Sequence, residues 1–465
     1  MRITRYRIMN REFFASKKIL VMGLGRFGGG VDVAKFACSA GAKVTITDLA
    51  SAEQLRDSIN QLKDCSNIEY HLGSHNAGDF EQADIIIVNP AVAPDNEFLE
   101  LARRHNKFIS TQINIFFELC PAPIIGITGA AGKSTTTALT AHLLRAGVGQ
   151  GKFKYRKVWL SGNIGNEPLL AVLDEICADD LVVLELSSFQ AERLAQIAKG
   201  PKVALLTNLT PNHLDRYGTF ADYCAAKENI FKFQELDRNC PAVSVFGAED
   251  KVGAEWFEKY KSEAGRICIK FSTDDVSEEI RDRFPLPGWA NLCNLAAAIA
   301  IARYFGIEDE WIKSSLPEFK PLPHRLELVG QIDDVCWYND SKATTPQSAI
   351  AALKAFDQPK IIIAGGYDKN LPFDELGEKI ARNAKAAILI GQTSEKIADA
   401  IAACPDGNAE VKFSDSLAEA VNVANQLAAP GDIVLLSPGC ASYDMFDNYQ
   451  HRGQEFTRLV KEING

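Results

Sequence analysis

The chain has little that would mark it as a nucleic-acid binder or as a secreted, disulfide-bonded protein. Its 465 residues carry 60 acidic and 50 basic side chains, a formal net charge of −10, and no long Lys/Arg run. Nucleic-acid binding needs basic patches that displace counterions, so this class is disfavoured. The eleven cysteines are scattered without a C-x-x-C pair, which argues against a disulfide framework and a thiolate zinc site. We expect a cytoplasmic protein that binds no nucleic acid.

Long apolar runs and low-complexity tracts are also absent. No apolar run approaches the roughly 20 residues that span a bilayer. The basic leader MRITRYRIMNREFF lacks the apolar core of a signal peptide. We therefore expect no membrane association. With 46% hydrophobic residues, a chain of this length has material for about three domains.

Short β-rich apolar runs alternate with helical patterns, which is typical of βαβ units and mostly parallel sheets. The runs span residues 18–23, 43–48, 83–89, 123–128, 181–186, 203–209, 360–366, 386–391 and 432–439. Proline-containing joints, CPAP and KPLPHR, predict three α/β domains of residues 1–120, 121–322 and 323–465. We expect a Rossmann-like first domain, a central P-loop ATPase-like domain and a Rossmann-like last domain.

The stretch GITGAAGKSTTT, residues 126–137, has the composition of a phosphate-binding loop. The strict G-x-x-x-x-G-K-[ST] pattern fails at its first glycine, but an apolar strand precedes the loop and a helix follows it. Backbone N–H groups freed by Gly129 and Gly132 can face phosphate oxygens. Lys133 can reach the terminal phosphates, and Ser134 can ligate magnesium. The sequence favours nucleotide phosphate over a chance glycine turn.

Two further side chains follow strands, at the edge where parallel sheets gather ligands. Glu185 interrupts the apolar strand of LVVLELSSFQ, and a buried carboxylate needs a cation or hydrogen bonds nearby. The alternative is a satisfied structural carboxylate. His213 in NLTPNHLDRYG lies a few residues after another strand. A lone histidine there is more often structural, but its company with Lys133 and Glu185 favours a ligand role.

The turn GLGRFG, residues 23–28, follows a strand, opens a helix and precedes Asp48 at the end of the next strand. Taken alone, this is the Rossmann fingerprint for a dinucleotide, with Asp48 on a ribose. We favour a different diphosphate ligand, because the second domain already carries an ATP loop. An NAD-dependent oxidoreductase stays open as an alternative.

Several motifs together resemble the Mur ligase family, and the likeness runs from Lys18 to the C-terminus. They are GITGAAGKSTTT, LELSSFQ, TNLTPNHLDRYGTFADYCAAK, GWANLCNLAAAIA, LPHRLE, WYNDSKAT and SPGCASYDMFDNYQHRGQEF. The family's loop is a shortened G-x-x-G-K-[ST], which matches the loop of this chain. LELSSFQ and SPGCASYDMF are similar to the forms of the family's D-glutamate-adding member. The resemblance implies an ATP- and Mg²⁺-dependent ligase in which a carboxylate takes the γ-phosphate and an amino group then displaces phosphate.

The resemblance also implies the substrates, UDP-N-acetylmuramoyl-L-alanine and D-glutamate, and a role in peptidoglycan synthesis and hence in cell shape and division. UDP is expected on the first domain, ATP on the central domain and the amino acid on the last. Lys227 matches a position where the family carries a carbamylated lysine, an anionic group beside the metal. The alternative for Lys227 is a surface lysine on an amphipathic helix. We expect a monomer.

The resemblance assigns roles to individual residues. The residues implied in catalysis are Lys133, His213 and Lys227. Those implied for ATP are Gly129, Gly132, Lys133, Ser134, Thr135, Asn291, Asn294, Arg325, Asp340 and Lys342. Those implied for the metal are Ser134, Glu185, His213 and Lys227. Those implied for the nucleotide sugar and the amino acid are Gly25, Phe27, Asp48, Asn89, Asn163, Thr344, Lys369, Ser442 and Tyr449.

Some positions depart from the family pattern. Ala130 and Ala131 replace a Thr-Asn pair in the phosphate loop, and NPAV, residues 89–92, replaces a serine-glycine form. Two alternatives stay open: another Mur-type ligase of different specificity, and a nucleotide-binding regulator that has lost catalysis. A glutamate-adding folate ligase shares the phosphate loop, but GLGRFG argues against it.

Overall fold

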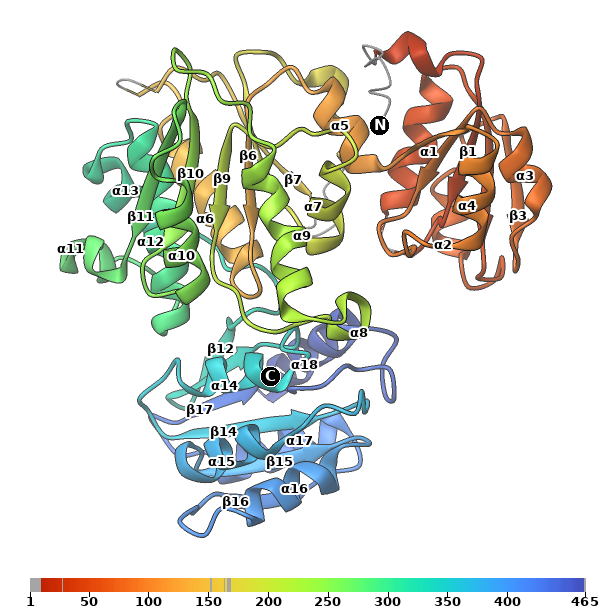
Figure 1. Cartoon of the computed structure of the whole chain (residues 1–465). Coiled ribbons are helices and arrows are strands. Elements are labelled where there is room, and N and C mark those ends of the chain that lie inside the picture. Colours follow the sequence, from red (N-terminus) through yellow and green to blue (C-terminus); the bar gives the residue numbers. More distant parts are fainter. Residues whose placement is uncertain (1–9, 27, 151–152, 163, 165–168, 464–465) are drawn as a thin grey trace. The chain divides into compact units, whose positions relative to one another are not determined.

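The computed structural model describes residues 10–26, 28–150, 153–162, 164 and 169–463. Three α/β sheets follow one another along the chain, each flanked by helices (Figure 1). Residue contacts divide the described chain into two compact units. The first comprises residues through Ser272 and Ala297–Ile312, and the second comprises Thr273–Ala296 and the residues from Lys313 onward.

The first sheet has five parallel strands in the order β3-β2-β1-β4-β5. They are β1 (Lys18–Met22), β2 (Lys43–Asp48), β3 (Ile68–Leu72), β4 (Ile85–Val88) and β5 (Phe108–Ser110). Its helices are η1 (Arg11–Phe14), α1 (Gly29–Ser39), α2 (Arg56–Asn60), α3 (Ala77–Gln82), α4 (Glu97–Arg104) and α5 (Gln112–Leu119). The connections that leave β1 and β4 run to opposite ends of the sheet, so their carboxyl ends border the crevice where such sheets bind ligands.

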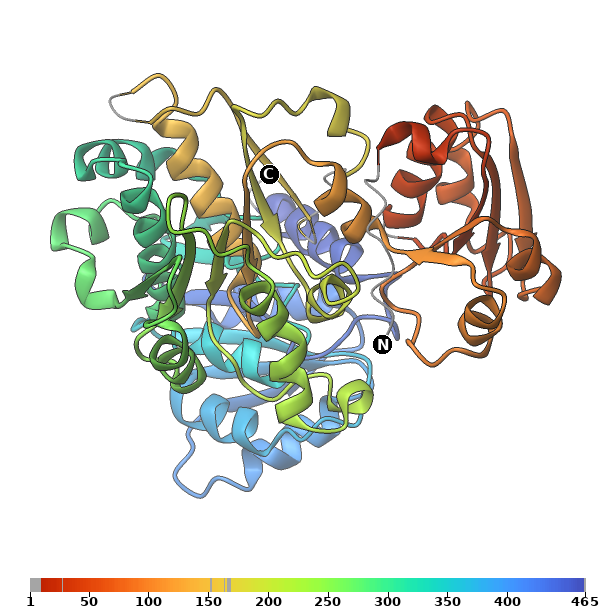
Figure 2. The same cartoon turned by 45° about the horizontal axis from the view of Figure 1, so that its top comes forward.

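The second sheet has six parallel strands in the order β11-β10-β9-β6-β8-β7. They are β6 (Ile124–Thr128), β7 (Val158–Gly162), β8 (Leu181–Glu185), β9 (Val203–Leu206), β10 (Ala242–Gly247) and β11 (Arg266–Phe271). Its helices are α6 (Lys133–Ala146), η2 (Leu173–Glu175), α7 (Ser188–Leu194), α8 (Leu214–Tyr217), α9 (Phe220–Lys232) and α10 (Lys251–Tyr260). Helix α6 packs on β7 and β8 (Figure 2). The crevice of this sheet lies between β6 and β9, whose connections leave in opposite directions.

The third sheet belongs to the second unit and has the order β12-β13-β17-β14-β15-β16, with only β12 and β13 antiparallel. Its strands are β12 (Glu327–Ile332), β13 (Val335–Asn339), β14 (Lys360–Gly365), β15 (Ala386–Ile390), β16 (Glu410–Phe413) and β17 (Ile433–Leu436). Its helices are α14 (Pro346–Leu353), α15 (Asp374–Asn383), α16 (Ser394–Ala402), α17 (Leu417–Leu427) and α18 (Tyr449–Ile463). The segment between the second and third sheets carries η3 (Thr273–Asp275), α11 (Glu278–Arg281), α12 (Trp289–Tyr304), α13 (Asp309–Ser315) and η4 (Leu316–Glu318).

All nine predicted apolar runs form strands, and each lies in a mostly parallel sheet as expected. The central strands β4, β8, β14 and β15 are buried along their whole length, as strands covered on both faces must be. The predicted α/β fold class is therefore confirmed. No helix in the described part of the chain combines the length and the apolar character needed to cross a bilayer.

Candidate active site

The glycine loop between β6 and α6 takes a path that only glycine follows at low cost. Gly129 has φ 153°, and a Cβ there would overlap the Thr207 hydroxyl. Gly132 has φ 79° and forms the N-cap of α6. Because β6 ends at the carboxyl edge of its sheet, these two turns present the N-terminus of a 14-residue helix there. A helix N-terminus of this kind binds phosphate through its N–H groups and its dipole.

The loop is held by the residues that follow β9. The Asn208 carbonyl accepts the Ala130 N–H at 2.8 Å, and Asn208 Oδ1 accepts the Ala131 N–H at 3.0 Å. The Thr207 hydroxyl donates to the Ala131 carbonyl at 2.6 Å, and Lys133 Nζ donates to the Ala130 carbonyl at 3.0 Å. The loop conformation therefore depends on backbone atoms, and the alanine pair supplies them. Thr207 and Asn208 were not predicted as site residues, although they lie near the end of the predicted apolar run 203–209.

A buried carboxylate and a buried lysine lie beside the loop. Glu185 ends β8 with 2% of its surface exposed, and Lys227 on α9 is 1% exposed. Lys227 Nζ donates to the Thr128 hydroxyl at 3.2 Å. Burial, and next the charge of Lys133, lower the pKa of Lys227 well below its ordinary value, while Glu185 opposes the shift. Three predicted residues, Lys133, Glu185 and Lys227, thus share one electrostatic environment.

His213 lies in an aromatic setting at the start of α8. Its backbone is left-handed, with φ 53°, which is uncommon for a residue with a side chain. Its ring centroid lies 5.1 Å from that of Phe189 and 6.2 Å from that of Tyr223. Lys227 Nζ lies 5.0 Å from the same Tyr223 ring. His213 and Lys227 therefore contact one shared aromatic ring, and Tyr223 is a neighbour that sequence analysis missed.

The oxygen donors beside the loop suit magnesium. Within the described residues, no three His, Cys, Asp or Glu side chains gather into a ready-made metal site. Mg²⁺ is commonly bound by one or two carboxylates together with substrate phosphates and water. The buried Ser134 hydroxyl and the buried Glu185 carboxylate are donors of this kind at the start of α6 and the end of β8. The residues therefore fit a metal that arrives with a nucleotide.

The residues predicted for the nucleotide sugar meet at the crevice of the first sheet. The Gly25 N–H donates to Asp48 Oδ2 at 3.0 Å, and Asn89 Nδ2 donates to the Gly23 carbonyl at 3.4 Å. A Cβ on Gly23 would overlap Asn89, so the turn needs glycine. The Ser58 hydroxyl, missed by sequence analysis, donates to the Gly25 carbonyl at 2.7 Å. Phe27, also predicted for this crevice, and Asn163, predicted for the central domain, lie outside the described residues.

In the second unit, Asp340 follows β13 and is buried. The Ser437 hydroxyl donates to Asp340 Oδ2 at 2.8 Å, and the Leu326 N–H donates to Oδ1 at 3.2 Å. Burial raises the pKa of Asp340 to about 7, although these hydrogen bonds lower it. Arg325 precedes Leu326, so two residues predicted for ATP come from loops that hydrogen-bond to one another.

The other predicted residues of the second unit form two further groups. Lys342 Nζ lies 5.0 Å from the Tyr449 ring centroid, and the Lys342 carbonyl accepts the Thr344 N–H at 2.9 Å. Lys369 Nζ lies 5.9 Å from the ring of Tyr443, which follows the buried Ser442. The remaining pair stands on α12, where Asn294 Nδ2 donates to Asn291 Oδ1 at 3.3 Å.

Arg452 is a buried residue of the second unit to which sequence analysis assigned no role. Its Nη2 donates to the carbonyls of Ser341 at 2.8 Å and Cys440 at 3.0 Å. These carbonyls flank predicted ligand positions in the loops after β13 and β17. The signal was the arginine in QHRGQEF, because an arginine on an apolar helix face needs several acceptors.

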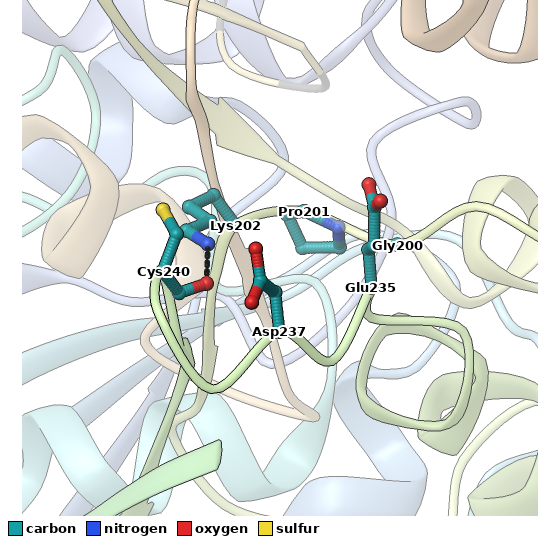
Figure 3. Close-up of a pocket in the computed structure, with 6 residues that line it drawn as sticks. All are labelled: Gly200, Pro201, Lys202, Glu235, Asp237 and Cys240. Atoms are coloured by element: carbon teal, nitrogen blue, oxygen red, sulfur yellow. Dashed lines mark hydrogen bonds between the residues drawn. The ribbon is translucent and has the colours of Figure 1, made fainter. Parts of the chain in front are cut away.

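A surface pocket lies at the opposite edge of the second sheet. Its volume is about 250 Å³, and it is lined by Gly200, Pro201, Lys202, Glu235, Asp237 and Cys240 (Figure 3). Lys202 precedes β9 and Cys240 precedes β10, so these residues stand at the amino ends of the strands. In parallel sheets, ligands bind at the carboxyl ends, and this pocket belongs to a different edge from the phosphate loop.

Comparisons with known proteins agree along the length of the chain. Residues 17–110 match the MurD-like N-terminal domain of Mur ligases, residues 127–283 the Mur ligase middle domain, and residues 324–440 the Mur ligase glutamate ligase domain. UDP-N-acetylmuramoylalanine--D-glutamate ligase of Roseiflexus sp. (strain RS-1) is 40% identical, with 97% of this chain and 99% of the relative covered. The enzyme of the same name from Geotalea uraniireducens (strain Rf4) is 36% identical, with 97% and 98% covered.

Solved structures agree on the fold. The crystal structure of UDP-N-acetylmuramate-alanine ligase MurC from Thermotoga maritima superposes with a TM-score of 0.60 at 19% identity, over 96% of this chain and 100% of that one. At this identity the likeness concerns the fold alone. Three matched domains in order, and relatives above 30% identity over almost the whole chain, lead to one conclusion. The chain belongs to the Mur ligase family, with an N-terminal domain of the MurD-like type.

Proposed function

We propose that the chain is an ATP-dependent ligase that joins D-glutamate to UDP-N-acetylmuramoyl-L-alanine in peptidoglycan precursor synthesis. The products are the amide, ADP and phosphate. One observation carries the proposal: the phosphate loop meets a buried Glu185 and a buried Lys227 at one edge of the second sheet. Support comes from a relative of that name that is 40% identical over 97% of this chain.

Each predicted domain has its own ligand in this proposal. The domain of residues 1–120 holds UDP, with diphosphate at the turn that contains Gly25 and the uracil near Asp48. The domain of residues 121–322 holds ATP at the phosphate loop. The domain of residues 323–465 holds the amino acid. We place the reaction in the cytoplasm, where ATP is available, and expect a monomer.

The first step activates the substrate carboxylate. A carboxylate oxygen forms a bond to the γ-phosphorus, and the bond from that phosphorus to the bridging oxygen breaks, so ADP leaves with the electron pair. Both reactants are anionic. Lys133, whose Nζ now rests on the Ala130 carbonyl at 3.0 Å, can swing to the phosphoryl oxygens and stabilise their charge in the transition state.

The second step forms the amide. The amino nitrogen of D-glutamate bonds to the acyl carbon, and the tetrahedral intermediate then expels phosphate with its electron pair, while the nitrogen loses a proton to solvent or to the departing phosphate. His213 stands at the shared edge beside Lys227 and orients the acyl end. The acyl phosphate is sensitive to water, so the site must exclude water while it exists.

Magnesium, when bound, lowers the repulsion between carboxylate and phosphate and stabilises the developing charge. Ser134 and Glu185 would hold one ion. A second ion needs an anionic partner, but Lys227 is a buried amine within the field of Lys133. Carbamylation of Lys227 would replace the amine with a carboxylate-like group. This group and His213 could then be ligands of the second ion.

The amino acid meets the predicted residues of the last domain. Lys369 can neutralise the side-chain carboxylate of glutamate. Ser442 and Thr344 can complete its hydrogen bonds, and Tyr449 supplies an apolar wall beside Lys342. In the same domain Arg325, Asp340 and Lys342 bind ATP, together with Asn291 and Asn294 of α12.

Phosphate release tests the function directly. The purified protein is given Mg-ATP, UDP-N-acetylmuramoyl-L-alanine and one amino acid at a time, including both enantiomers of glutamate. We expect release only with D-glutamate, together with a new amide detected by mass. Release with another amino acid would indicate a ligase of different specificity. Bound ATP without release would favour the regulatory alternative that the alanine pair in the loop suggested.

A further inference from the structure

The side chain of Arg216 is held by contacts with two residues of α7, near the phosphate-loop site. Arg216 lies in α8, three residues after His213, and its side chain is 17% exposed. Its Cζ lies 4.0 Å from the centroid of the Phe189 ring. Its Nη2 donates to Glu192 Oε2 at 3.2 Å. A stacked ring and a carboxylate together hold the planar guanidinium in one orientation.

The other end of the same guanidinium reaches the nucleotide crevice of the first sheet. Arg216 Nη1 donates to the carbonyls of Pro90 at 3.2 Å and Ala91 at 3.3 Å. These residues directly follow Asn89, which donates through Nδ2 to the Gly23 carbonyl of the glycine turn. Arg216 therefore holds the loop that packs on the turn predicted to bind diphosphate.

One ring connects the arginine to the histidine. The Phe189 ring centroid lies 4.0 Å from Arg216 Cζ and 5.1 Å from the centroid of the His213 ring. The Arg216 N–H also donates to the His213 carbonyl at 3.1 Å. A shift of the Pro90–Ala91 carbonyls would therefore reach the surroundings of His213 through the side-chain and backbone contacts of Arg216.

We propose that Arg216 is a positioning residue that couples occupancy of the first-sheet crevice to the placement of His213. A ligand that fixes Asn89 and the loop after it also fixes Arg216, and with it Phe189. The second ligand then binds to a site that is already ordered, so its affinity rises, and the effect is reciprocal. The inference rests on the proposed function, because it takes the two ligands to be the UDP-sugar and the magnesium nucleotide.

The chain offers a matched control. Arg103 on α4 donates from Nη2 to the Pro94 carbonyl at 2.7 Å, so it holds the same connection after β4. Arg103 belongs to the first sheet, whereas Arg216 belongs to the second. Arg103→Met therefore removes an arginine-to-carbonyl bond from the connection and leaves the bonds of Arg216, and that of Arg193 to the Val92 carbonyl, in place.

The test is a pair of calorimetric titrations. UDP-N-acetylmuramoyl-L-alanine is titrated into the full chain with and without Mg²⁺ and a non-hydrolysable ATP analogue, and the ratio of the two dissociation constants is the coupling. We expect about tenfold for the unaltered protein, which is within the usual range for coupled sites. Arg216→Met should reduce the ratio to about twofold or less, whereas Arg103→Met should retain it.

Arg216→Lys provides the conservative comparison. Lysine keeps a charge over Phe189 but has no planar fork to reach both carbonyls, so an intermediate ratio is expected. Thermal melts check the fold of each variant. If Arg216→Met does not fold, Arg216→Lys decides the question, and a ratio equal to that of the unaltered protein overturns the proposal.

The two proposals fail in different ways. Unaltered protein that releases phosphate with D-glutamate but shows no coupling overturns the role of Arg216 and leaves the function standing. Unaltered protein that neither binds the UDP-sugar nor releases phosphate overturns both. Arg216→Met with an undiminished coupling overturns the role of Arg216 alone.

Discussion

The glycine turns after β1 and β6 have the same position in their sheets but different neighbouring charged residues. Both leave a strand at a switch point of a parallel sheet and open a helix. After β1, the Gly25 N–H is taken by the Asp48 carboxylate, which also accepts the Ala50 N–H at 2.8 Å. After β6, Lys133 occupies the first helical position, and a second lysine, Lys227, lies buried in its field.

In the proposed function, both glycine turns bind phosphate groups, and the neighbouring charges determine whether the bound phosphate is held or transferred. An acidic partner suits the hydroxyls or ring N–H of a nucleoside, so the first turn is fitted to hold a ligand unchanged. A lysine with buried carboxylate and hydroxyl oxygens suits charge that develops during transfer. Substitutions can test this division between a phosphate that is held and one that reacts.

The largest effect is expected at Lys133. Lys133→Ala should lower kcat by about 10³-fold or more, because a charge that stabilises the transition state is lost. The dissociation constant for UDP should stay unchanged, since the first turn is intact. Steady-state phosphate release and calorimetry measure the two quantities. Lys199→Ala, on the surface of the same sheet domain, is the control, and full activity in Lys133→Ala would refute the loop assignment.

Lys227 should show the next largest effect. Lys227→Ala is expected to lower kcat by about 10²-fold, because the anionic group proposed at this position is lost. Formate or acetate in the buffer should restore part of the rate by supplying a carboxylate. Lys232→Ala removes an exposed lysine from the same helix. Its kcat should equal that of the unaltered protein, with or without added formate or acetate. Absence of any rescue would count against the carbamate.

Asp340 extends the test to a buried carboxylate of the third sheet. Its pKa is raised to about 7 in the folded protein, so the protonated form is favoured below about pH 7. The stabilisation is fully present below the unfolded value near pH 4 and is lost as pH rises through about 7.

Asp340→Asn removes this titration. The free energy of unfolding of the unaltered protein, relative to the variant, should fall by an amount on the order of 1–4 kcal/mol between pH 4 and pH 8. Denaturant titrations at several pH values measure it. Asp399→Asn, on the exposed face of α16, should leave the pH profile unchanged. If the free energy of unfolding of Asp340→Asn changed with pH in the same way as that of the unaltered protein, the raised pKa of Asp340 would be contradicted.

Substitution of Asp48 should weaken binding of the UDP-sugar and leave the chemical step almost unchanged. Asp48→Asn loses an acceptor of the Gly25 N–H and is expected to raise the KM for the UDP-sugar about tenfold, since a charged hydrogen bond is worth roughly 1.5 kcal/mol. The value of kcat should stay within about twofold. Initial rates over a range of substrate concentrations separate the two. Asp57→Asn on α2 is the exposed control. A large loss of kcat in Asp48→Asn would contradict the assignment of the first turn to binding alone.

The smallest effect is expected at Ala131. Because Thr207 and Asn208 already hold the loop backbone, Ala131→Asn should change the KM for ATP by about twofold at most. Asn208→Ala should raise it about tenfold, since two bonds to Ala131 disappear. A variant of Ala131 that binds ATP far more tightly would show that side chains, and not only backbone, matter here.

Strands rich in apolar residues were predicted, including β2 with its two threonines, whereas several strands with charged, polar or exposed residues were not. Edge strands β3 and β16 read IEYHL and EVKF, with charged residues and partial exposure. In β10 a serine interrupts the run, and its hydroxyl donates to Gln234 Oε1 at 2.7 Å, a partner ten residues away. Such partners are set by tertiary packing, which local pattern does not contain.

The same limit applied to the site. Charged residues proposed for the site, such as Lys133 and Glu185, stood out because they interrupt glycine or apolar stretches. Residues that hold the loop, such as Asn208 and Thr207, resemble ordinary turn residues. Their role follows from the adjacency of β6 and β9, which are separated by two other strands in the chain.

The left-handed backbone of His213 means that a substitution that stabilises the fold at this position would also remove the imidazole. Glycine or asparagine would relieve the strain at φ 53°, so a search for more stable variants would favour either of them there. Such a variant would melt later and lose the imidazole beside Phe189 and Tyr223. Under the proposed function, rankings of substitutions by thermal stability alone would therefore remove a residue that the reaction needs, and this position should be exempted from them.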